Sequence, residues 1–289
     1  MRESIVRGRK RFHDLKRILA LLILCSLILS GICVPARAAA DAAAEEAETE
    51  ETVEAAQTAE GAGEESEAEG QPTFEHLNYK TPHMNDAWIY RYPGSDHLII
   101  WFPGGSSKPL IDKSLAEKLY KGKLTPKCNV LLPWKRGSGP SPKEMRELIE
   151  FACPEAKHLS IAGYSLGADR AARMVRDAPD MFERVVLISN YHQQWDKMVD
   201  QLQCETVFLV GFTESSGSGY LPWKILRKYE RGWLYRVAPY KHEIGEKIWL
   251  DERFDILGWL SGETDQIYIG DAALLQEESD RRWFVKAPK

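Results

Sequence analysis

From residue 86 onward, short apolar runs alternate with segments that have helical periodicity. The strand-like runs cover residues 88–92, 98–102, 129–132, 158–162, 185–188, 206–210 and 233–237. Several of them are apolar throughout, which is typical of strands that are covered on both faces. The helical patterns lie near residues 110–121, 141–152, 166–178, 193–201, 220–230 and 245–260. This alternation predicts an α/β fold, with a mostly parallel sheet and helices on both of its faces.

The clearest helix start is at Ser141, which Pro142 and a capping-box Glu144 follow. Apolar residues then recur at helical spacing, at Met145, Leu148, Ile149 and Ala152. In a parallel sheet with helices on both faces, functional sites lie beyond the carboxyl ends of the strands. Candidate functional residues are therefore expected in the loops that follow the predicted strands.

The first 38 residues have the pattern of a secretory signal peptide. Seven of the first 17 residues are Lys or Arg, and an apolar run of 17 residues, 18–34, follows them. The segment ends in Ala36-Arg37-Ala38, a small-residue cleavage pattern. An uncleaved signal anchor is the alternative, since 17 residues is the lower limit of a membrane span. In both cases the basic flank stays inside and the rest of the chain is exported.

Charge divides the chain into three parts. Residues 1–40 contain eight Lys or Arg and two Asp or Glu, whereas residues 41–70 contain twelve Asp or Glu and no Lys or Arg. The whole chain has a net charge of −5, so residues 71–289 carry only +1. We interpret residues 39–72 as a disordered acidic linker, because they have almost no large apolar side chains. The near-neutral remainder argues against nucleic acid as a partner.

The strongest chemical signal is Gly163-Tyr164-Ser165-Leu166-Gly167, which comes directly after a predicted strand. A helical pattern with Ala168, Ala171, Ala172 and Val175 follows it. G-x-S-x-G between a strand and a helix predicts a nucleophile elbow, a tight turn that exposes the serine above a helix N-terminus. Small flanking residues are required because the strand and the helix approach each other closely there. Ser165 is therefore the candidate nucleophile.

A serine nucleophile needs a base, and the base needs an orienting carboxylate. His242 follows the strand at 233–237, and Glu214 follows the strand at 206–210. The order Ser165, Glu214, His242 agrees with the Ser…Asp/Glu…His order of one particular fold. Asp196 is the alternative acid and His192 the alternative base, since both follow the strand at 185–188.

On these residues the chain resembles the α/β-hydrolase superfamily over about residues 86–260. A further element of the resemblance is the loop Phe102-Pro103-Gly104-Gly105-Ser106, where many members carry His in place of Pro103. The resemblance implies an oxyanion hole formed by the N–H of Leu166 and by an N–H of Gly104, Gly105 or Ser106. It also implies an acyl-enzyme mechanism. The connection after the strand at 185–188 is short, which predicts little or no lid domain.

Other residues near the predicted site have less specific roles. Tyr164 precedes the nucleophile and is expected to line the site, as are Trp134, His192 and Trp195 in loops after strands. Packing of the two tryptophans as core or rim is the alternative. No metal-ligand spacing and no nucleotide fingerprint occurs, so we expect neither a metal nor a cofactor.

Two features outside the predicted site remain open. Cys128, Cys153 and Cys204 each precede a strand, and a Cys128–Cys153 disulfide is one alternative for them. After a hydrolase domain at 73–262, the tail at 263–289 either adds an edge strand or packs loosely.

The sequence as a whole predicts an exported serine hydrolase that cleaves carboxylic esters of a small-molecule or acylated substrate. Contact with a membrane is expected only through an uncleaved N-terminal segment. A peptidase, amidase or thioesterase on the same scaffold is one alternative, because fold does not determine the substrate. A non-catalytic surface binding module is the other.

Overall fold

The computed structural model describes residues 70–81, 86–105, 114–134, 139–189, 203–212, 214 and 230–288. The predicted signal at 1–38 and nearly all of the predicted linker at 39–72 lie outside these residues. So do the helix expected at 193–201 and, apart from its last residue, the helix expected at 220–230. The segment 190–202, where the prediction of a minimal lid would be tested, also lies outside them.

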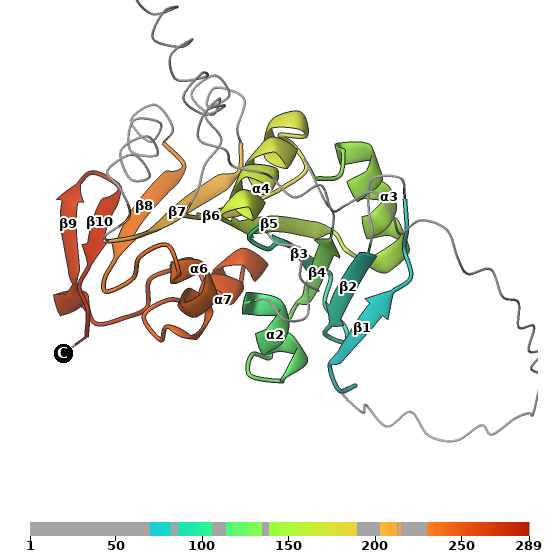
Figure 1. Cartoon of the computed structure of the whole chain (residues 1–289), viewed down its shortest axis with the longest axis horizontal. Coiled ribbons are helices and arrows are strands. Elements are labelled where there is room, and N and C mark those ends of the chain that lie inside the picture. Colours follow the sequence, from blue (N-terminus) through green and yellow to red (C-terminus); the bar gives the residue numbers. More distant parts are fainter. Residues whose placement is uncertain are drawn as a thin grey trace, which may run out of the picture. The chain divides into compact units, whose positions relative to one another are not determined.

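The described strands form a single ten-stranded sheet in the order β1-β2-β4-β3-β5-β6-β7-β8-β10-β9 (Figure 1). These strands are β1 (Thr73–Leu77), β2 (Asp86–Arg91), β3 (His97–Phe102), β4 (Asn129–Trp134), β5 (His158–Tyr164), β6 (Arg184–Ile188), β7 (Glu205–Gly211), β8 (Gly232–Val237), β9 (Leu275–Ser279) and β10 (Arg282–Val285). The neighbours from β4 through β3, β5, β6, β7 and β8 to β10 are parallel. β1, β2 and β9 pair antiparallel at the two ends of the sheet.

Alternate residues of the central strands enter two different hydrophobic cores. In β3, Leu98, Ile100 and Phe102 belong to one core, whereas Ile99 and Trp101 belong to the other. This follows from the twofold side-chain period of a strand, and it explains why the run is apolar throughout. The prediction of a mostly parallel sheet with both faces covered is confirmed.

Each face of the sheet has its own helices (Figure 1). The first core includes buried residues of α3 (Pro142–Ala152) and α4 (Leu166–Asp177). The second includes residues of α2 (Ser114–Tyr120), α6 (Ile244–Lys247) and α7 (Ile256–Ser261). The start of α3 is as predicted, because Ser141 and Glu144 form a complete capping box there.

The prediction of a single helix at 245–260 is wrong. The chain forms α6, then the 3-10 turn η4 (Ile248–Leu250), and begins a new helix only at Ile256. The side chain of Asp255 caps α7 by accepting the N–H of Gly258 at 2.9 Å. Between the two helices, Asp251 bonds to Tyr240 and Arg253, and these polar contacts hold the chain in a turn.

The tail extends the sheet, which settles the open alternative for residues 263–289. After the 3-10 turn η5 (Ala272–Leu274), β9 and β10 form a hairpin whose second strand pairs parallel with β8. Val285 of β10 is fully buried. The neighbouring side chains Trp283 and Phe284 contact aromatic rings of Tyr235 and Phe212 respectively.

Cys128, Cys153 and Cys204 are buried free thiols, so the Cys128–Cys153 disulfide considered as an alternative is absent. Cys128 and Cys153 lie in different cores, on opposite faces of the sheet. Burial raises the pKa of both thiols to about 12. Within the described part of the chain, no helix is sufficiently long and apolar to span a membrane.

Candidate active site

Ser165 occupies a strained turn between β5, which ends at Tyr164, and α4, which begins at Leu166. Its φ of 53° and ψ of −120° are unusual for a residue with a side chain. The flanking glycines allow the close approach that such a turn needs. A Cβ atom at Gly167 would lie 2.1 Å from the carbonyl oxygen of Phe102, and one at Gly163 would lie 2.3 Å from that of Gly167. No other residue fits at these two positions without displacing backbone.

A chain of hydrogen bonds links Ser165 to His242 and His242 to Glu214. The distance from Ser165 Oγ to His242 Nε2 is 3.1 Å, and that from His242 Nδ1 to Glu214 Oε1 is 2.6 Å. Ser165 follows β5, Glu214 follows β7 and His242 follows β8, so all three lie beyond the carboxyl ends of parallel strands. The structure therefore brings together the three residues selected from the sequence.

The carboxylate of Glu214 is held from its second oxygen. Glu214 Oε2 accepts hydrogen bonds from the Ser189 hydroxyl at 2.8 Å and from the Gly211 N–H at 2.9 Å. The Glu214 side chain is 8% exposed, whereas the His242 side chain is 55% exposed. The arrangement leaves Oε1 for the imidazole and keeps the carboxylate away from water, while the imidazole remains accessible. Sequence reasoning missed Ser189, although its position just after β6 was a signal for it.

Tyr164 contacts the loop after β8 that carries His242. Its hydroxyl donates a hydrogen bond to the carbonyl oxygen of His242 at 2.8 Å, and the two ring centroids are 5.3 Å apart. Burial, with smaller contributions from the nearby carboxylates of Glu246 and Glu214, raises the pKa of Tyr164 to about 12. The phenol is therefore neutral at physiological pH and remains a hydrogen-bond donor.

The backbone beside Ser165 offers N–H groups for an anion. Leu166 is the first residue of α4, and the first N–H groups of a helix have no partner within it. Gly105 lies against this position, since a Cβ atom there would be 3.0 Å from Leu166 Cδ2. Gly104 packs on the ring of Tyr164 in the same way, with a corresponding distance of 2.9 Å. Both predicted donor segments thus lie next to the serine; Ser106 is outside the described residues.

A cavity of about 510 Å³ opens at the serine and has a mixed polar and apolar lining. It is lined by Pro103, Gly104, Gly105, Ser114, Glu117, Lys118, Tyr164, Ser165, His242, Glu246 and Lys247. Glu117 and Lys118 of α2 and Glu246 and Lys247 of α6 form a charged wall of this cavity. Ser114 Oγ donates to the carbonyl oxygen of Gly245 at 2.5 Å, and Lys118 Nζ donates to that of Glu246 at 2.8 Å. Burial lowers the pKa of Lys118. These contacts join residues about 130 positions apart, so no local sequence signal could have revealed them.

The other predicted site residues lie elsewhere or are not described. Trp134 ends β4 and packs against the core on the α2 side, and it is not among the residues that line the cavity. Asp196, His192 and Trp195 lie outside the residues that the structure describes. Glu214, the acid that the sequence predicts, lies with Oε1 2.6 Å from His242 Nδ1.

Comparison with known proteins gives structural matches only. No protein-family model matches the chain, and a search of curated proteins finds no match. A predicted hydrolase from Thermoplasma acidophilum is 13% identical over 61% of this chain and 93% of its own, with a TM-score of 0.46. An esterase from Pyrococcus furiosus is 13% identical over 60% of this chain and 86% of its own, with a TM-score of 0.46.

A feruloyl esterase module from Clostridium thermocellum is 10% identical over 61% of this chain and 86% of its own, also with a TM-score of 0.46.

The topology of the chain itself identifies the fold. The mostly parallel sheet, the turn at Ser165 after β5 and the order of Ser165, Glu214 and His242 are those of the α/β-hydrolase fold that the sequence predicts.

Proposed function

We propose that this chain is an exported serine hydrolase that cleaves carboxylic esters through an acyl-enzyme intermediate. The observation that carries the proposal is the hydrogen-bond chain from Ser165 Oγ through the imidazole of His242 to Glu214 Oε1, with distances of 3.1 and 2.6 Å. A serine hydroxyl is a weak nucleophile, and a neutral imidazole at this distance is the group that activates it. A purely structural serine would need no such partner and no strained backbone.

In the first half of the reaction, Ser165 attacks the acyl carbonyl. Glu214 accepts the Nδ1–H of His242, which leaves Nε2 free of its proton and able to take the proton of Ser165 as Oγ bonds to the carbonyl carbon. The negative charge that develops on the carbonyl oxygen is stabilised by the N–H of Leu166 and by an N–H of the Gly104–Gly105 segment. The imidazolium then gives its proton to the departing alcohol, and the acyl group stays on Ser165.

In the second half, water hydrolyses the acyl-enzyme. His242 Nε2 takes a proton from water as the water oxygen attacks the acyl carbon, and the same proton returns to Ser165 Oγ when the acid leaves. The 55% exposure of the His242 side chain supports this step, because water can reach the imidazole directly.

The character of the cavity supports small, polar esters as substrates. Four of its lining residues, Glu117, Lys118, Glu246 and Lys247, carry charge, and its apolar lining includes Pro103 and Tyr164. A long acyl chain needs an extended apolar channel, whereas an acetyl-sized acyl group on a polar alcohol is compatible with these side chains. Export rests on the basic start and the apolar run of residues 1–38.

A serine-directed fluorophosphonate probe tests the proposal. The wild-type chain should be labelled at Ser165, and labelling should be lost in Ser165→Ala and reduced in His242→Gln. Ser279→Ala, which changes a serine on β9 far along the chain, is the matched control and should label like the wild type. Absence of labelling in a folded wild-type chain would contradict the catalytic proposal and favour a binding module. Turnover of amide or thioester substrates above short esters would contradict only the substrate class.

A further inference from the structure

Three potential metal ligands gather at the amino ends of β3 and β5, at the opposite end of β5 from Ser165. Asp96 directly precedes β3, His97 begins β3, and His158 begins β5. Their donor atoms all lie within 4.8 Å of one another. All three side chains are partly exposed, so an ion can reach them from solvent. Two imidazoles and a carboxylate form a mixed nitrogen and oxygen donor set that suits a transition metal.

The backbone holds these residues in a fixed relation. His97 and His158 are paired in the register of two parallel strands. The carbonyl oxygen of Asp96 accepts the N–H of Lys157 at 2.8 Å and that of His158 at 3.2 Å. The start of β3 and the start of β5 are therefore joined directly at the cluster.

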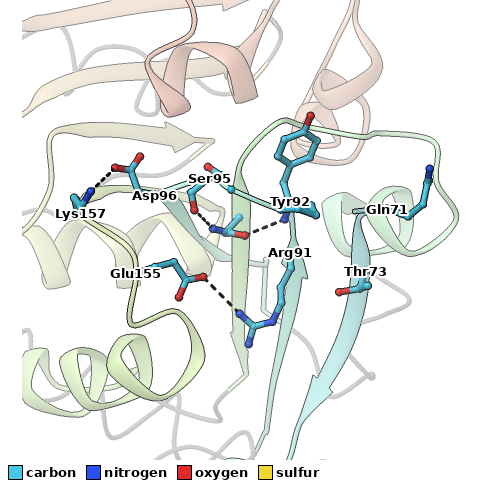
Figure 2. A pocket seen from close by; sticks show the side chains of 11 residues that line it. Gln71, Thr73, Arg91, Tyr92, Ser95, Asp96, Glu155 and Lys157 are labelled. Atoms are coloured by element: carbon cyan, nitrogen blue, oxygen red, sulfur yellow. Dashed lines mark hydrogen bonds and ion pairs between the residues drawn. The ribbon is translucent and has the colours of Figure 1, made fainter. Parts of the chain in front are cut away.

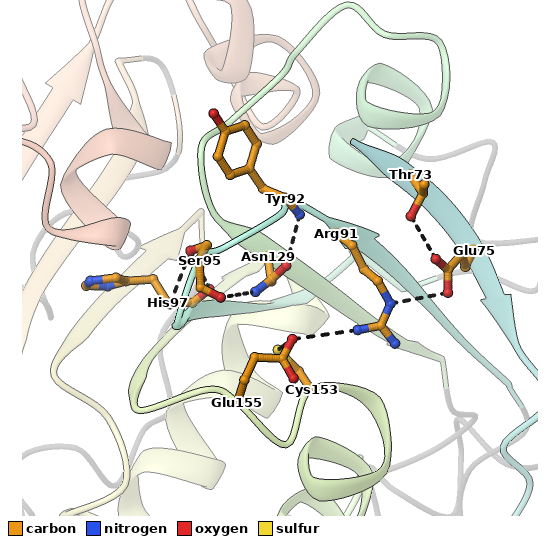
Figure 3. A network of polar contacts seen from close by, with 9 residues as sticks. All are labelled: Thr73, Glu75, Arg91, Tyr92, Ser95, His97, Asn129, Cys153 and Glu155. Carbon is orange, nitrogen blue, oxygen red and sulfur yellow. Dashed lines mark hydrogen bonds and ion pairs between the residues drawn. The ribbon is translucent and has the colours of Figure 1, made fainter. Parts of the chain in front are cut away.

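A buried amide fixes the turn that leads into Asp96. Asn129 is 1% exposed, and its side chain accepts the N–H of Tyr92 and donates to the carbonyl oxygen of Ser95, each at 2.9 Å (Figure 3). The hollow beside this turn has a volume of about 610 Å³ and includes Asp96 and Lys157 in its lining (Figure 2). Asp96 therefore follows a turn that is held by hydrogen bonds and borders this hollow, while His97 and His158 lie on paired strands.

Each side chain keeps a donor after its existing contacts are counted. Glu183 Oε1 lies 2.8 Å from His158 Nδ1, which leaves Nε2 as the nitrogen that can bind an ion. Carboxylate contacts of this kind orient metal-binding histidines and increase their basicity. Lys157 Nζ lies 3.3 Å from Asp96 Oδ2, while the other oxygen, Oδ1, lies 3.9 Å from His97 Nε2.

We propose that Asp96, His97 and His158 bind a divalent transition-metal ion, with Zn²⁺ as the best match. Tetrahedral zinc at about 2.0–2.1 Å from each donor places the donors about 3.3 Å apart. The donor atoms, now up to 4.8 Å apart, therefore have to approach by at most about 1.5 Å, which rotation of partly exposed side chains can supply.

The two imidazole rings are now stacked at 4.5 Å between centroids, and they would turn to direct one nitrogen each at the ion. Water completes the fourth position. Ca²⁺ and Mg²⁺ fit poorly, because they prefer oxygen ligands.

The consequence is a link between the amino ends of β3 and β5. An ion that binds the native state and not the unfolded chain stabilises the fold by mass action. The site is independent of Ser165, so it is proposed as structural and separate from the hydrolase.

Titration of the full-length, metal-stripped chain with ZnCl₂ in a calorimeter tests the proposal, with Co²⁺ absorption as a second readout of tetrahedral nitrogen and oxygen ligands. All titrations use a His242→Gln background, since His242 itself can bind zinc. We expect one equivalent of zinc and a higher Tm with zinc present. His97→Gln and His158→Gln should each weaken binding at least about tenfold, and Glu183→Gln by a smaller factor.

His76→Gln, which changes a histidine on β1, is the matched control and should bind as its background does. The proposal would be overturned if the His97→Gln and His158→Gln variants bound zinc as tightly as the His242→Gln background. It would also be overturned if the folded chain gave no heat and no Co²⁺ spectrum. Esterase activity of the wild type with and without zinc reports separately on the proposed hydrolase, so the two proposals can fail independently.

Discussion

At the scale of single residues, the two oxygens of Glu214 have different partners. Oε1 faces the imidazole of His242, and Oε2 is held by Ser189 and by the backbone N–H of Gly211. Ser189 is itself in a left-handed conformation, with φ of 55°, and is buried. A strained, buried serine that points its hydroxyl at the carboxylate restricts the carboxylate to one orientation. We infer that Ser189 positions the acid without touching the substrate.

The substitution Ser189→Ala should therefore lower kcat with little change in KM. A hydrogen bond to a charged group contributes about 1.5–3 kcal/mol, which corresponds to roughly a 10–100-fold loss in kcat/KM if the whole contribution acts in the transition state. Ser160→Ala is the matched control, because its hydroxyl is also buried but donates to the carbonyl oxygen of Leu260 at 2.7 Å. Steady-state kinetics on a short ester decides the matter. A similar loss in both variants would point to general destabilisation instead.

At the scale of elements, a polar cluster separates η4 from α7. Arg253 Nε lies 2.8 Å from Asp251 Oδ1, and Tyr240 donates to Asp251 Oδ2 at 2.8 Å. The side chains of Asp251 and Arg253 are only 6% and 9% exposed. Burial raises the pKa of Asp251, but hydrogen bonds from Arg253 and Tyr240 outweigh it and leave the pKa below its ordinary value. Arg253 also donates to the carbonyl oxygen of Lys286, so the cluster holds the C-terminal tail.

Because the pKa of Asp251 is lowered in the folded state, the stability that it contributes is present above its unfolded pKa and is lost as pH falls through the folded pKa. Arg253→Met leaves this carboxylate buried without its partner and should lower the free energy of unfolding by about 3–5 kcal/mol at pH 7. The difference in the free energy of unfolding between Arg253→Met and the wild type should become smaller toward pH 4, because the unpaired Asp251 carboxylate is then protonated more readily.

Urea denaturation at both pH values measures these differences. Arg176→Met, which removes a surface pair with Asp177, should cost about 1 kcal/mol or less. A deficit for Arg253→Met that is independent of pH would contradict the electrostatic explanation.

At the scale of the whole molecule, β10 and β9 protect the edge of the sheet that carries the base. β8 leads directly into the loop of His242, and its outer side is covered by β10. Tyr235 of β8 stacks on Trp283 of β10 with 5.3 Å between ring centroids. Without this cover, β8 would present unpaired backbone groups and aromatic surface to solvent, which favours edge-to-edge aggregation.

Truncation after Gly270 should therefore lower Tm, promote aggregation and reduce hydrolase activity together, because the same strand supports both the edge and the histidine loop. Truncation after Lys286 keeps β10 and the hydrogen bond from the Lys286 N–H to the carbonyl oxygen of Leu274, and it should behave like the full chain. Thermal denaturation and size-exclusion chromatography distinguish the two. A monomeric, fully active chain that ends at Gly270 would show that the edge strands are dispensable.

The local sequence determined much of this protein. All seven predicted strands are present, and the capping box at Ser141 and the glycines around Ser165 act where the pattern placed them. These features depend on side-chain period, capping and backbone sterics, which are set by neighbours in the chain. The positions of Glu214 and His242 directly after parallel strands then predicted that both lie at the same edge of the sheet as Ser165.

Tertiary structure alone decided the contacts between distant segments. Ser189 meets Glu214 across two strands, and α2 meets α6 across about 130 residues to form the charged wall of the cavity. The helix expected at 245–260 breaks because Asp251 finds Tyr240 and Arg253, an interaction that outweighs the apolar periodicity of that segment. Likewise, His97 and His158 become neighbours only through the pairing of β3 with β5. Such contacts depend on which surfaces the folded sheet brings together. The periodicity of apolar residues along the chain therefore cannot predict them.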